Sequence, residues 1–423
     1  MAPLPEMFRL RQHFDTIRVD DVAGEVDRQL GRLALGNQIR PGQSVAVAVG
    51  SRGIANLVDI VRAVVDHLRR LEAEPFVVTA MGSHGGATVE GQLHILESYG
   101  VTESAVGCPV RSNLETVVVC HTDDGVAVHF DRLAFEADHV IVCNRVKPHT
   151  MFAGPIESGL MKMLLIGLGN HTGAGVYHRA IQRSSFTRVV ETAGREVLRR
   201  CRIAAGLAIV ENGYDQTARI EAARPDEFFD VESRLLELAR RLMARLPFED
   251  VDLLVVDQIG KDLSGTGLDS NVTGRKSNDH AAVEGETPRV LRIAVRSLSQ
   301  ATAGSALGIG MTEFCRTRII RQADWPATWA NVLASGHIGA AMRPLDYETD
   351  RQMIEAALGT VGLSEPAAAR VLWIPDTLHL TELECSAAYL EEVEQREDLE
   401  VLTPPRAMPI DDEGNLPDDA FSV

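Results

Sequence analysis

The chain has 423 residues, 45% of them hydrophobic and 24% charged, with a formal net charge of −18 at pH 7. Because a single core stops growing at roughly 250 to 300 residues, two domains are expected. An acidic chain without a basic stripe repels phosphate backbones, which argues against nucleic-acid binding. The N-terminal segment offers no signal peptide, and no apolar run reaches the roughly 18 to 20 residues of a membrane span. We therefore expect a cytoplasmic protein that does not contact membranes.

Short β-branched runs alternate with helical patterns along the first half of the chain. Strands are predicted at residues 44–50, 75–80, 115–120, 126–130 and 138–144, and a helix at 56–71. This alternation is typical of α/β proteins with largely parallel sheets. In open α/β sheets ligands bind at the carboxyl ends of strands, so Arg52, His84 and His149 are expected at a site.

The second half of the chain repeats the alternation after a charged helical segment at 231–250. Further strands are predicted at 250–260, 289–299 and 367–376, and helices at 323–336 and 386–397. We therefore expect two α/β domains, residues 1–250 and 251–423, with the active site in the cleft between them. The Pro- and Asp-rich tail at 404–423 is expected to lie loosely on the surface.

Residues 146–181 gather His149, Lys162, His171 and His178 in one apolar, glycine-rich stretch. Imidazole is the usual general base and also binds divalent transition metals. A partly desolvated lysine is a nucleophilic amine. The alternative for each residue is structural, since a lysine in an apolar helix more often reaches the surface than reacts.

Two glycine-flanked residues precede this stretch. Arg52 lies between Gly50 and Gly53 just past a predicted strand, where a guanidinium can hold a carboxylate through two hydrogen bonds. His84 lies in MGSHGG, where glycines let the backbone approach a ligand closely. No G-K-[ST] follows, so a triphosphate-binding loop is not predicted. Taken singly, Arg52 is also an ordinary surface arginine and His84 an ordinary turn histidine.

With these residues the chain resembles the nickel-dependent lactate racemase family, the 2-hydroxyacid racemases and epimerases that use a nickel-pincer nucleotide. The resemblance covers nearly the whole chain in length and domain order. The family has an arginine, two catalytic histidines, a cofactor-binding lysine and a nickel-ligating histidine, matched here by Arg52, His84, His149, Lys162 and His178. The resemblance thus places the catalytic and cofactor-attachment residues in the domain at 1–250, and the domain at 251–423 completes the substrate pocket.

The chain departs from lactate-type members at three places. Val49 stands where they have an aspartate before the arginine, and the segment from His149 to Lys162 is slightly longer. Where they show D-Q-N-x-Y-Q-x-x-K, residues 269–277 read DSNVTGRKS. The cofactor residues are thus kept while the substrate residues change.

The altered segment bears on the substrate. Thr273 and Gly274 replace a tyrosine and a glutamine, and smaller side chains at a pocket wall would admit an acid larger than lactate, such as an aldonate. We expect Arg52, Thr273 and either Arg275 or Lys276 to bind this substrate. The alternative is that 269–277 is a mobile loop whose composition tells nothing about the pocket.

The resemblance implies an isomerase that inverts C2 of a 2-hydroxy acid by removing a hydride and returning it to the other face. A hydride needs an acceptor that no side chain supplies, so a cofactor is required. The implied cofactor is the nickel-bearing pyridinium-3-thioamide-5-thiocarboxylic acid mononucleotide, covalently bound to Lys162 and made by other proteins in trans. His178 would be the metal ligand, and His84 and His149 the two bases, one for each enantiomer.

Other interpretations remain open. A zinc hydrolase would use His84, His149 and His178 as ligands. A non-enzymatic, nucleotide-sensing or cofactor-carrier protein would retain the pincer cofactor but lack turnover. His171 has no counterpart in the family, and the oligomeric state is left open.

Overall fold

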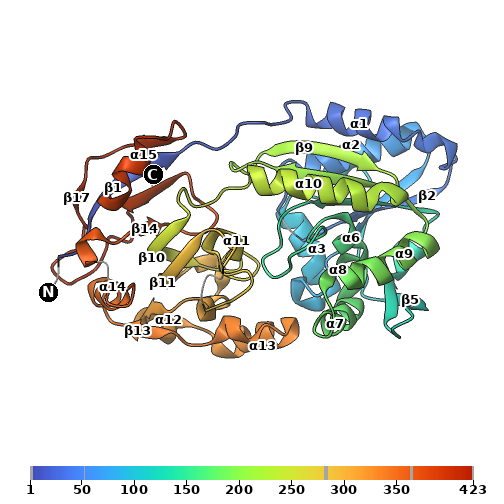
Figure 1. The fold of residues 1–423 in the computed structure, drawn as a ribbon. Helices are drawn as coiled ribbons and strands as arrows, with labels where there is room; N and C mark the ends of the chain where they lie inside the picture. Colours follow the sequence, from blue (N-terminus) through green and yellow to red (C-terminus); the bar gives the residue numbers. More distant parts are fainter. Residues whose placement is uncertain (1–2, 52, 281–283, 363–364, 422–423) are drawn as a thin grey trace. The chain divides into compact units, whose positions relative to one another are not determined.

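A computed structural model describes residues 3–51, 53–280, 284–362 and 365–421 (Figure 1). The chain divides into two compact units, Asp15–Met243 and Ala244–Val423 together with Met1–Phe14. We call them the N-terminal and C-terminal units. Both are α/β, as expected. The first fourteen residues, expected in the N-terminal domain, belong to the C-terminal unit because their strand pairs there with β15 and β16.

The N-terminal unit is built on a six-stranded sheet in the order β4-β3-β2-β7-β8-β9. Its strands are β2 (Ser44–Val49), β3 (Glu74–Thr79), β4 (Val110–Arg111), β7 (His139–Arg145), β8 (Ile203–Glu211) and β9 (Thr217–Ala223). All neighbours pair in parallel except β8 and β9, which are antiparallel. The strands predicted at 44–50, 75–80 and 138–144 are therefore confirmed.

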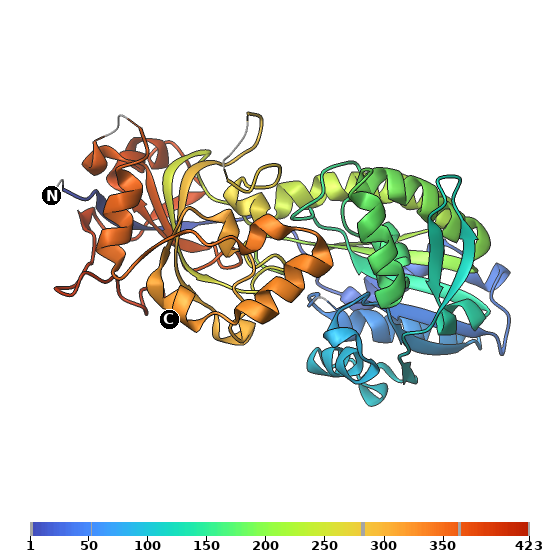
Figure 2. The same cartoon turned by 90° about the horizontal axis from the view of Figure 1, so that it is seen from below.

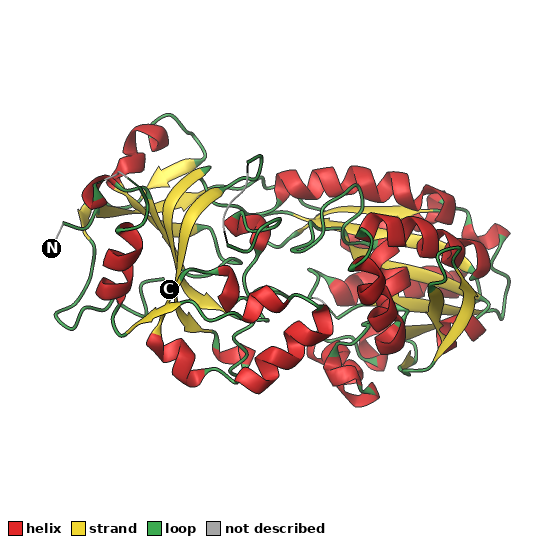
Figure 3. Ribbon diagram, turned by 60° about the horizontal axis from the view of Figure 1, so that its bottom comes forward, coloured by secondary structure: helices red, strands yellow, loops and turns green. Residues whose placement is uncertain are grey.

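Helices cover both faces of this sheet, because its strands are apolar on both sides. Val45, Val47 and Val49 of β2 pack in one core with α2 (Leu57–Arg70), and Ala46 and Ala48 pack in the other with α10 (Phe228–Leu242). Figure 3 shows the strands in yellow among red helices. The remaining helices of the unit are α1 (Val22–Arg32), α3 (Val89–Ser98), α4 (Glu103–Val106), α5 (Arg132–Glu136), α6 (Leu160–Lys162), α7 (Asn170–Ile181), α8 (Phe186–Val189) and α9 (Arg195–Arg200).

The strands predicted at 115–120 and 126–130 form a separate hairpin. β5 (Thr116–His121) and β6 (Ala127–Asp131) pair antiparallel in a two-stranded sheet. The link between them is short and turns at Gly125, whose φ is +77°. Parallel pairing would need a crossover of a dozen or more residues, so only a hairpin fits.

The C-terminal unit holds a nine-stranded sheet in the order β13-β12-β11-β10-β14-β15-β1-β16, with β17 on β1. Its strands are β1 (Glu6–Gln12), β10 (Asp250–Ile259), β11 (Arg289–Leu298), β12 (Phe314–Arg316), β13 (Leu345–Tyr347), β14 (Val371–Ile374), β15 (Glu382–Ser386), β16 (Leu399–Val401) and β17 (Arg406–Ala407). The strands from β13 to β14 run parallel, and those around β1 run antiparallel. The blue β1 lies among the orange and red strands in Figure 2.

The helices of this unit are α11 (Ser270–Thr273), α12 (Thr317–Gln322), α13 (Trp325–Ser335), α14 (Asp350–Leu358) and α15 (Leu390–Val393). The helix predicted at 323–336 is confirmed as α13, whereas the one predicted at 386–397 is reduced to the short α15 after a 3-10 turn. No helix in the described parts of the chain is long and apolar enough to cross a membrane.

The described part of the tail, residues 404–421, packs against the rest of the C-terminal unit, so the expectation of a loose surface segment is wrong. Leu416 is 3% exposed. Its N–H donates to Asp350 Oδ2 at 2.9 Å, and its C=O accepts from Arg296 Nη2 at 2.6 Å. These contacts join the tail to residues far away in sequence, which composition alone does not reveal.

Candidate active site

The loops that carry His84 and His149 leave the same edge of the N-terminal sheet. The last residue of β2, Val49, is level with Thr79 of β3 and with Cys143 of β7. His84 follows β3 and His149 follows β7, on either side of β2. Because neighbouring strands lie about 5 Å apart, the two strands that lead to these histidines are about 10 Å apart. Arg52, expected in the loop after β2, lies outside the described residues.

His84 is exposed and is oriented by the loop after β2. Its Nδ1 is hydrogen-bonded to the hydroxyl of Ser51. Tyr99 in turn donates to the C=O of Ser51 at 3.1 Å. In the tautomer whose Nδ1–H donates to this hydroxyl, Nε2 is the unprotonated nitrogen, which is the form a general base needs.

The loop that carries His84 packs against the segment that follows Lys162. Gly82 has φ +59°, and a Cβ there would lie 2.9 Å from the C=O of Ile166. Its N–H donates to the C=O of Gly167 at 3.2 Å. Only glycine permits this backbone conformation and this close approach together.

His149 is held in a tight loop by its own neighbours. Its N–H donates to Glu157 Oε2 at 2.8 Å, and its Nδ1 accepts from the N–H of Met151 at 3.0 Å. The imidazole stacks on Phe152 with ring centroids 4.2 Å apart. Since Nδ1 is an acceptor, the neutral ring carries its proton on Nε2. His149 is therefore arranged as a hydrogen-bond donor, and it must give up the Met151 contact to act as a base through Nε2.

Lys162 is the last residue of α6, which lies at the carboxyl ends of the central strands. At the end of β7, Asn144 Nδ2 donates to the C=O of Gly159 at 2.8 Å, just before the helix. At the end of β2, a Cβ on Gly50 would meet Met163 Cε at 2.8 Å. The π-helical turn Met163–Gly167 continues from Lys162 toward the loop of β3. The expected tether thus lies at the same edge as the two expected bases.

His178 lies on α7, half-buried, and close to Lys162. Burial lowers the pKa of its imidazole first, and the ammonium group of Lys162 lowers it further. Both effects favour the neutral ring, which is the form that binds a metal. The structure therefore brings the expected tether and the expected metal ligand together.

Helix α7 is fixed by polar contacts with β6. The Tyr177 hydroxyl accepts from the N–H of His129 at 2.9 Å and donates to its C=O at 3.1 Å. Asn170 Nδ2 donates to Asp131 Oδ2 at 2.8 Å, and burial raises the pKa of Asp131 to about 6. These contacts hold the helix that presents His178. His171 is exposed on the same helix, and its role stays open.

Two of the expected substrate residues are packed inside the C-terminal unit, which corrects the expectation. Thr273 is 0% exposed and its hydroxyl donates to the C=O of Asp269 at 3.3 Å. Arg275 is 1% exposed, and its Nη2 lies 3.0 Å from Glu313 Oε1. A Cβ on Gly274 would lie 1.8 Å from the C=O of Pro288. Thr273 and Gly274 are thus closely packed in the core, and their small size opens no space in a pocket wall.

Lys276 and Asn271 keep polar groups near the carboxyl end of β10. Lys276 Nζ donates to Asn271 Oδ1 at 3.2 Å, and Asn271 Nδ2 donates to Asp269 Oδ1 at 3.0 Å. Of the expected substrate residues in this unit, Lys276 is the one whose side chain remains partly accessible. Of the pair Arg275 and Lys276, Lys276 is therefore the residue whose side chain a ligand could reach.

Sequence reasoning missed a histidine next to this group. His379 follows β14, the parallel neighbour of β10, and its Nδ1 lies 2.8 Å from Asp376 Oδ2. The N–H of Asp269 donates to Thr377 Oγ1 at 3.1 Å, which joins the two loops. A histidine just past a predicted strand at 367–376 was a usable signal, because ligands gather at such ends.

Sequence reasoning also missed two buried carboxylates in the N-terminal unit, Glu157 and Glu232, both 0% exposed. Glu232 lies on the apolar stripe of α10 with Val231, Leu235 and Leu236. A carboxylate in such a stripe is a detectable anomaly. Glu157 follows the apolar Ile156 in a loop and gives no comparable signal.

No group of three or more metal-binding side chains that could hold an ion is found among the described residues. The zinc-hydrolase alternative needs such a group from His84, His149 and His178, all of which are described, so it has no support here.

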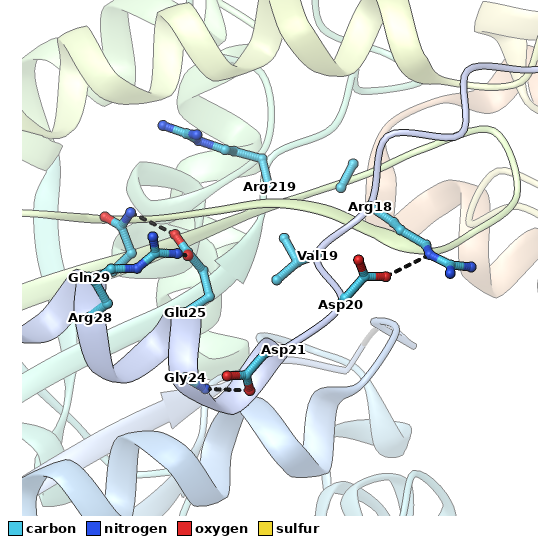
Figure 4. A pocket seen from close by; sticks show the side chains of 10 residues that line it. Arg18, Val19, Asp20, Asp21, Gly24, Glu25, Arg28, Gln29 and Arg219 are labelled. Atoms are coloured by element: carbon cyan, nitrogen blue, oxygen red, sulfur yellow. Dashed lines mark hydrogen bonds and ion pairs between the residues drawn. The ribbon is translucent and has the colours of Figure 1, made fainter.

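A surface cavity of about 550 Å³ in the N-terminal unit lies between the start of α1 and β9 (Figure 4). It is lined by arginines and carboxylates that pair locally: Arg18 Nε lies 2.9 Å from Asp20 Oδ1, and Arg28 pairs with Glu25. None of the expected site residues lines it.

Comparison with known proteins bears on the family and the fold. Residues 18–188 match the family model of the lactate racemase N-terminal domain. The lactate racemase apoprotein of Thermoanaerobacterium thermosaccharolyticum has a similar structure, with a TM-score of 0.58 and 13% identity over 87% of this chain and 93% of that chain. At this identity the likeness shows the fold alone.

A protein of Thermotoga maritima from a structural genomics programme aligns with a TM-score of 0.48 and 13% identity over 67% of this chain and 72% of that chain, too weakly to argue from. No curated protein matches the chain. The resemblance expected from the sequence is confirmed by this match of residues 18–188 to the lactate racemase N-terminal domain and by the similar fold.

Proposed function

We propose that this protein inverts C2 of a 2-hydroxy acid, using a nickel-pincer nucleotide bound covalently to Lys162, with His178 as the metal ligand. The observation that carries the proposal is the proximity of Lys162 to His178 at the carboxyl edge of a lactate racemase-like domain. An amine able to form the covalent link and a neutral imidazole able to bind nickel are the two donors this cofactor needs. When bound, the cofactor supplies the hydride acceptor that no side chain provides.

The proposed task of the histidines is to move the hydroxyl proton. His84, whose Nδ1 is bonded to Ser51, takes the proton through Nε2 from one enantiomer. His149 would give a proton to the hydroxyl oxygen as an imidazolium ion, when the other enantiomer forms, and would take one up as a neutral ring in the reverse direction. Both roles need a proton on Nδ1 at some stage, so the loop of His149 has to release the Met151 N–H that now donates to Nδ1. C2 would be inverted when hydride returns to the other face of the planar keto acid, and bases that follow β3 and β7, on either side of β2, would serve the hydroxyl in both orientations.

The proposed substrate contacts are Arg52, Lys276 and Asn271. A guanidinium holds a carboxylate through two hydrogen bonds, and an ammonium group supplies a point charge. Asn271 and His379 add hydrogen-bonding groups that would suit further hydroxyls. We expect an acid larger than lactate because of the polar groups of Lys276, Asn271 and His379. Thr273 and Gly274 do not contribute to this expectation, because they are packed inside the unit.

The direct test is turnover by holoprotein purified from cells that also make the cofactor. Lactate, malate and C5 and C6 aldonates are offered singly, and inversion at C2 is followed by chiral chromatography. The proposal predicts inversion of at least one acid. If none is inverted by protein that carries both adduct and nickel, the chain is a cofactor-binding protein without this activity. If lactate is inverted faster than every longer acid, the expectation of a larger substrate is wrong.

A further inference from the structure

Helix α10 contacts both the segment of the proposed tether and the loop of the proposed base. Glu232 and Arg240, eight positions apart on this helix, make these contacts. At a rise of 1.5 Å per residue they are separated by about 12 Å along the helix axis. One helix thus contacts both segments, which are separated in sequence by residues 158 and 159.

Glu232 caps the helix that ends in Lys162. Its Oε2 accepts the N–H of Met161 at 3.0 Å, and the N–H of Leu160 also donates to this carboxyl group. A Cβ on Gly159 would lie 2.5 Å from Oε1, so the carboxyl is pressed against the first turn of α6. The first N–H groups of a helix have no partner within it, and here a buried side chain from another helix supplies one.

The burial of Glu232 is costly, which makes a purely packing role a poor explanation. Its side chain is fully buried, and Oε1 has no hydrogen-bond partner among the described atoms. An apolar side chain would avoid that cost, but it would leave the N–H groups of Leu160 and Met161 without this acceptor. The carboxyl is therefore best understood by what it does to the start of α6.

Arg240 holds the loop of His149 through a second buried carboxylate. Glu157 accepts the N–H of His149 at 2.8 Å and the N–H of Gly154 at 3.2 Å, and these hydrogen bonds close the loop formed by residues 149–157. Arg240 Nη2 donates to Glu157 Oε1 at 2.7 Å and to the C=O of Gly154 at 3.1 Å. The guanidinium neutralises the carboxylate of Glu157 and also holds the backbone of Gly154, so it fixes the loop at two points.

We infer that α10 sets the position of the His149 loop relative to Lys162, with Glu232 and Arg240 as positioning residues. This inference rests on the proposed function of His149 and Lys162. A displacement of about 1 Å at a reacting group can lower a rate by about 10²-fold, so a common support for base and tether matters for the reaction.

The test compares Glu232→Ala and Arg240→Met with Arg234→Met. Arg234 is a matched control, because it lies on the same helix and pairs with a carboxylate, Glu221, at 2.5 Å, but fastens α10 to β9 and away from the site. Three quantities are measured for each variant: amide hydrogen exchange of the protein without cofactor, the fraction of holoprotein with an adduct on Lys162, and kcat and KM in both directions.

We expect a separation of effects. Arg240→Met speeds exchange at His149 and Gly154, keeps the adduct, and lowers kcat by about 10- to 100-fold with little change in KM. Glu232→Ala speeds exchange at Leu160 and Met161 and lowers the fraction with an adduct. Arg234→Met leaves hydrogen exchange unchanged in both segments, even if its melting temperature falls as much as that of the other two variants.

Two results would overturn the inference: unchanged exchange at both segments, or equal losses of kcat in Arg240→Met and Arg234→Met at equal stability. If wild-type protein made with the cofactor proteins carries no adduct and turns over no acid, the proposed function fails. The exchange pattern still decides in that case whether α10 holds the two segments.

Discussion

Lys162 and His178 lie close enough for the charge of the lysine to act on the histidine. Burial is the larger reason why the pKa of His178 is lowered, and the ammonium group of Lys162 is the second. Positive charges on both side chains would repel each other, so the ammonium group favours the neutral form of the imidazole. Conversion of the Lys162 amine would remove the repulsion, which is why we connect this pair with a tethered cofactor.

The first prediction concerns the metal. His178→Ala should keep the covalent adduct on Lys162 and lose nickel, because the two residues hold different parts of one group. Metal analysis beside intact mass checks this directly. His171→Ala, on the same helix but exposed, is the control and should retain both. Nickel at wild-type content in His178→Ala would assign the metal ligand to another residue.

The second prediction concerns the bases. His84→Ala and His149→Ala should each lower activity by at least about 10²-fold, the usual range for a lost general acid or base. Both directions should suffer in each variant, since each ring is acid in one direction and base in the other. Initial rates from each pure enantiomer measure this. Full activity in either variant would mean that the pair is misassigned.

The third prediction separates two neighbours in sequence. Arg275→Ala should destabilise the C-terminal unit, because breaking a buried ion pair typically costs about 3 to 5 kcal/mol. Lys276→Ala should leave stability nearly unchanged and raise KM for the acid, because its ammonium group is partly accessible. Thermal unfolding and steady-state kinetics on both variants decide the matter. A stable Arg275→Ala with a raised KM would restore the substrate role to Arg275.

The fourth prediction concerns Glu232 and pH. Burial raises the pKa of its carboxyl to about 7, from an ordinary value of 4.5. Between these values the folded chain holds a proton that the unfolded chain has released, so this group's contribution to stability is lost as pH rises toward 7. The whole effect is on the order of 3 kcal/mol. The amide of Glu232→Gln does not titrate, so the stability of this variant relative to wild type should increase as pH rises from about 4.5 to 7.

Urea unfolding at several pH values measures this difference, and Glu221→Gln is its control. Although burial raises the pKa of Glu221, Arg234 and Arg219 hold it below the usual value. Its contribution is therefore present above the unfolded pKa and lost as pH falls, so its variant should show the opposite trend. A Glu232→Gln variant whose stability runs parallel to wild type at every pH would rule out a raised pKa.

Local pattern was enough to predict most of the parallel strands. The alternating valines and alanines of 44–50 end at Gly50, and β2 ends at Val49. β1 could not be found this way, because its partners β15 and β16 lie at the other end of the chain. The hairpin of β5 and β6 was predicted as strands, but its separation from the main sheet follows from the length of its link.

The placement of candidate residues at the carboxyl edge of the sheet was predictable where the residue follows a strand, as for His84 and His149. It was not predictable where a role depends on a distant partner. Arg275 looks like a substrate residue until Glu313, thirty-eight positions away, is seen to pair with it. The positions of Glu157 and Arg240 likewise emerge only from packing, because nothing in either local sequence points to the other.

The most direct test of the account is the mass of the intact protein, made in cells that also produce the cofactor, with peptide mapping and metal analysis of the same sample. The account predicts one nucleotide-sized adduct, mapped to Lys162, with about one nickel per chain, and no adduct in Lys162→Ala. An adduct on any other lysine, or an unmodified chain without nickel that nevertheless inverts a 2-hydroxy acid, would contradict it.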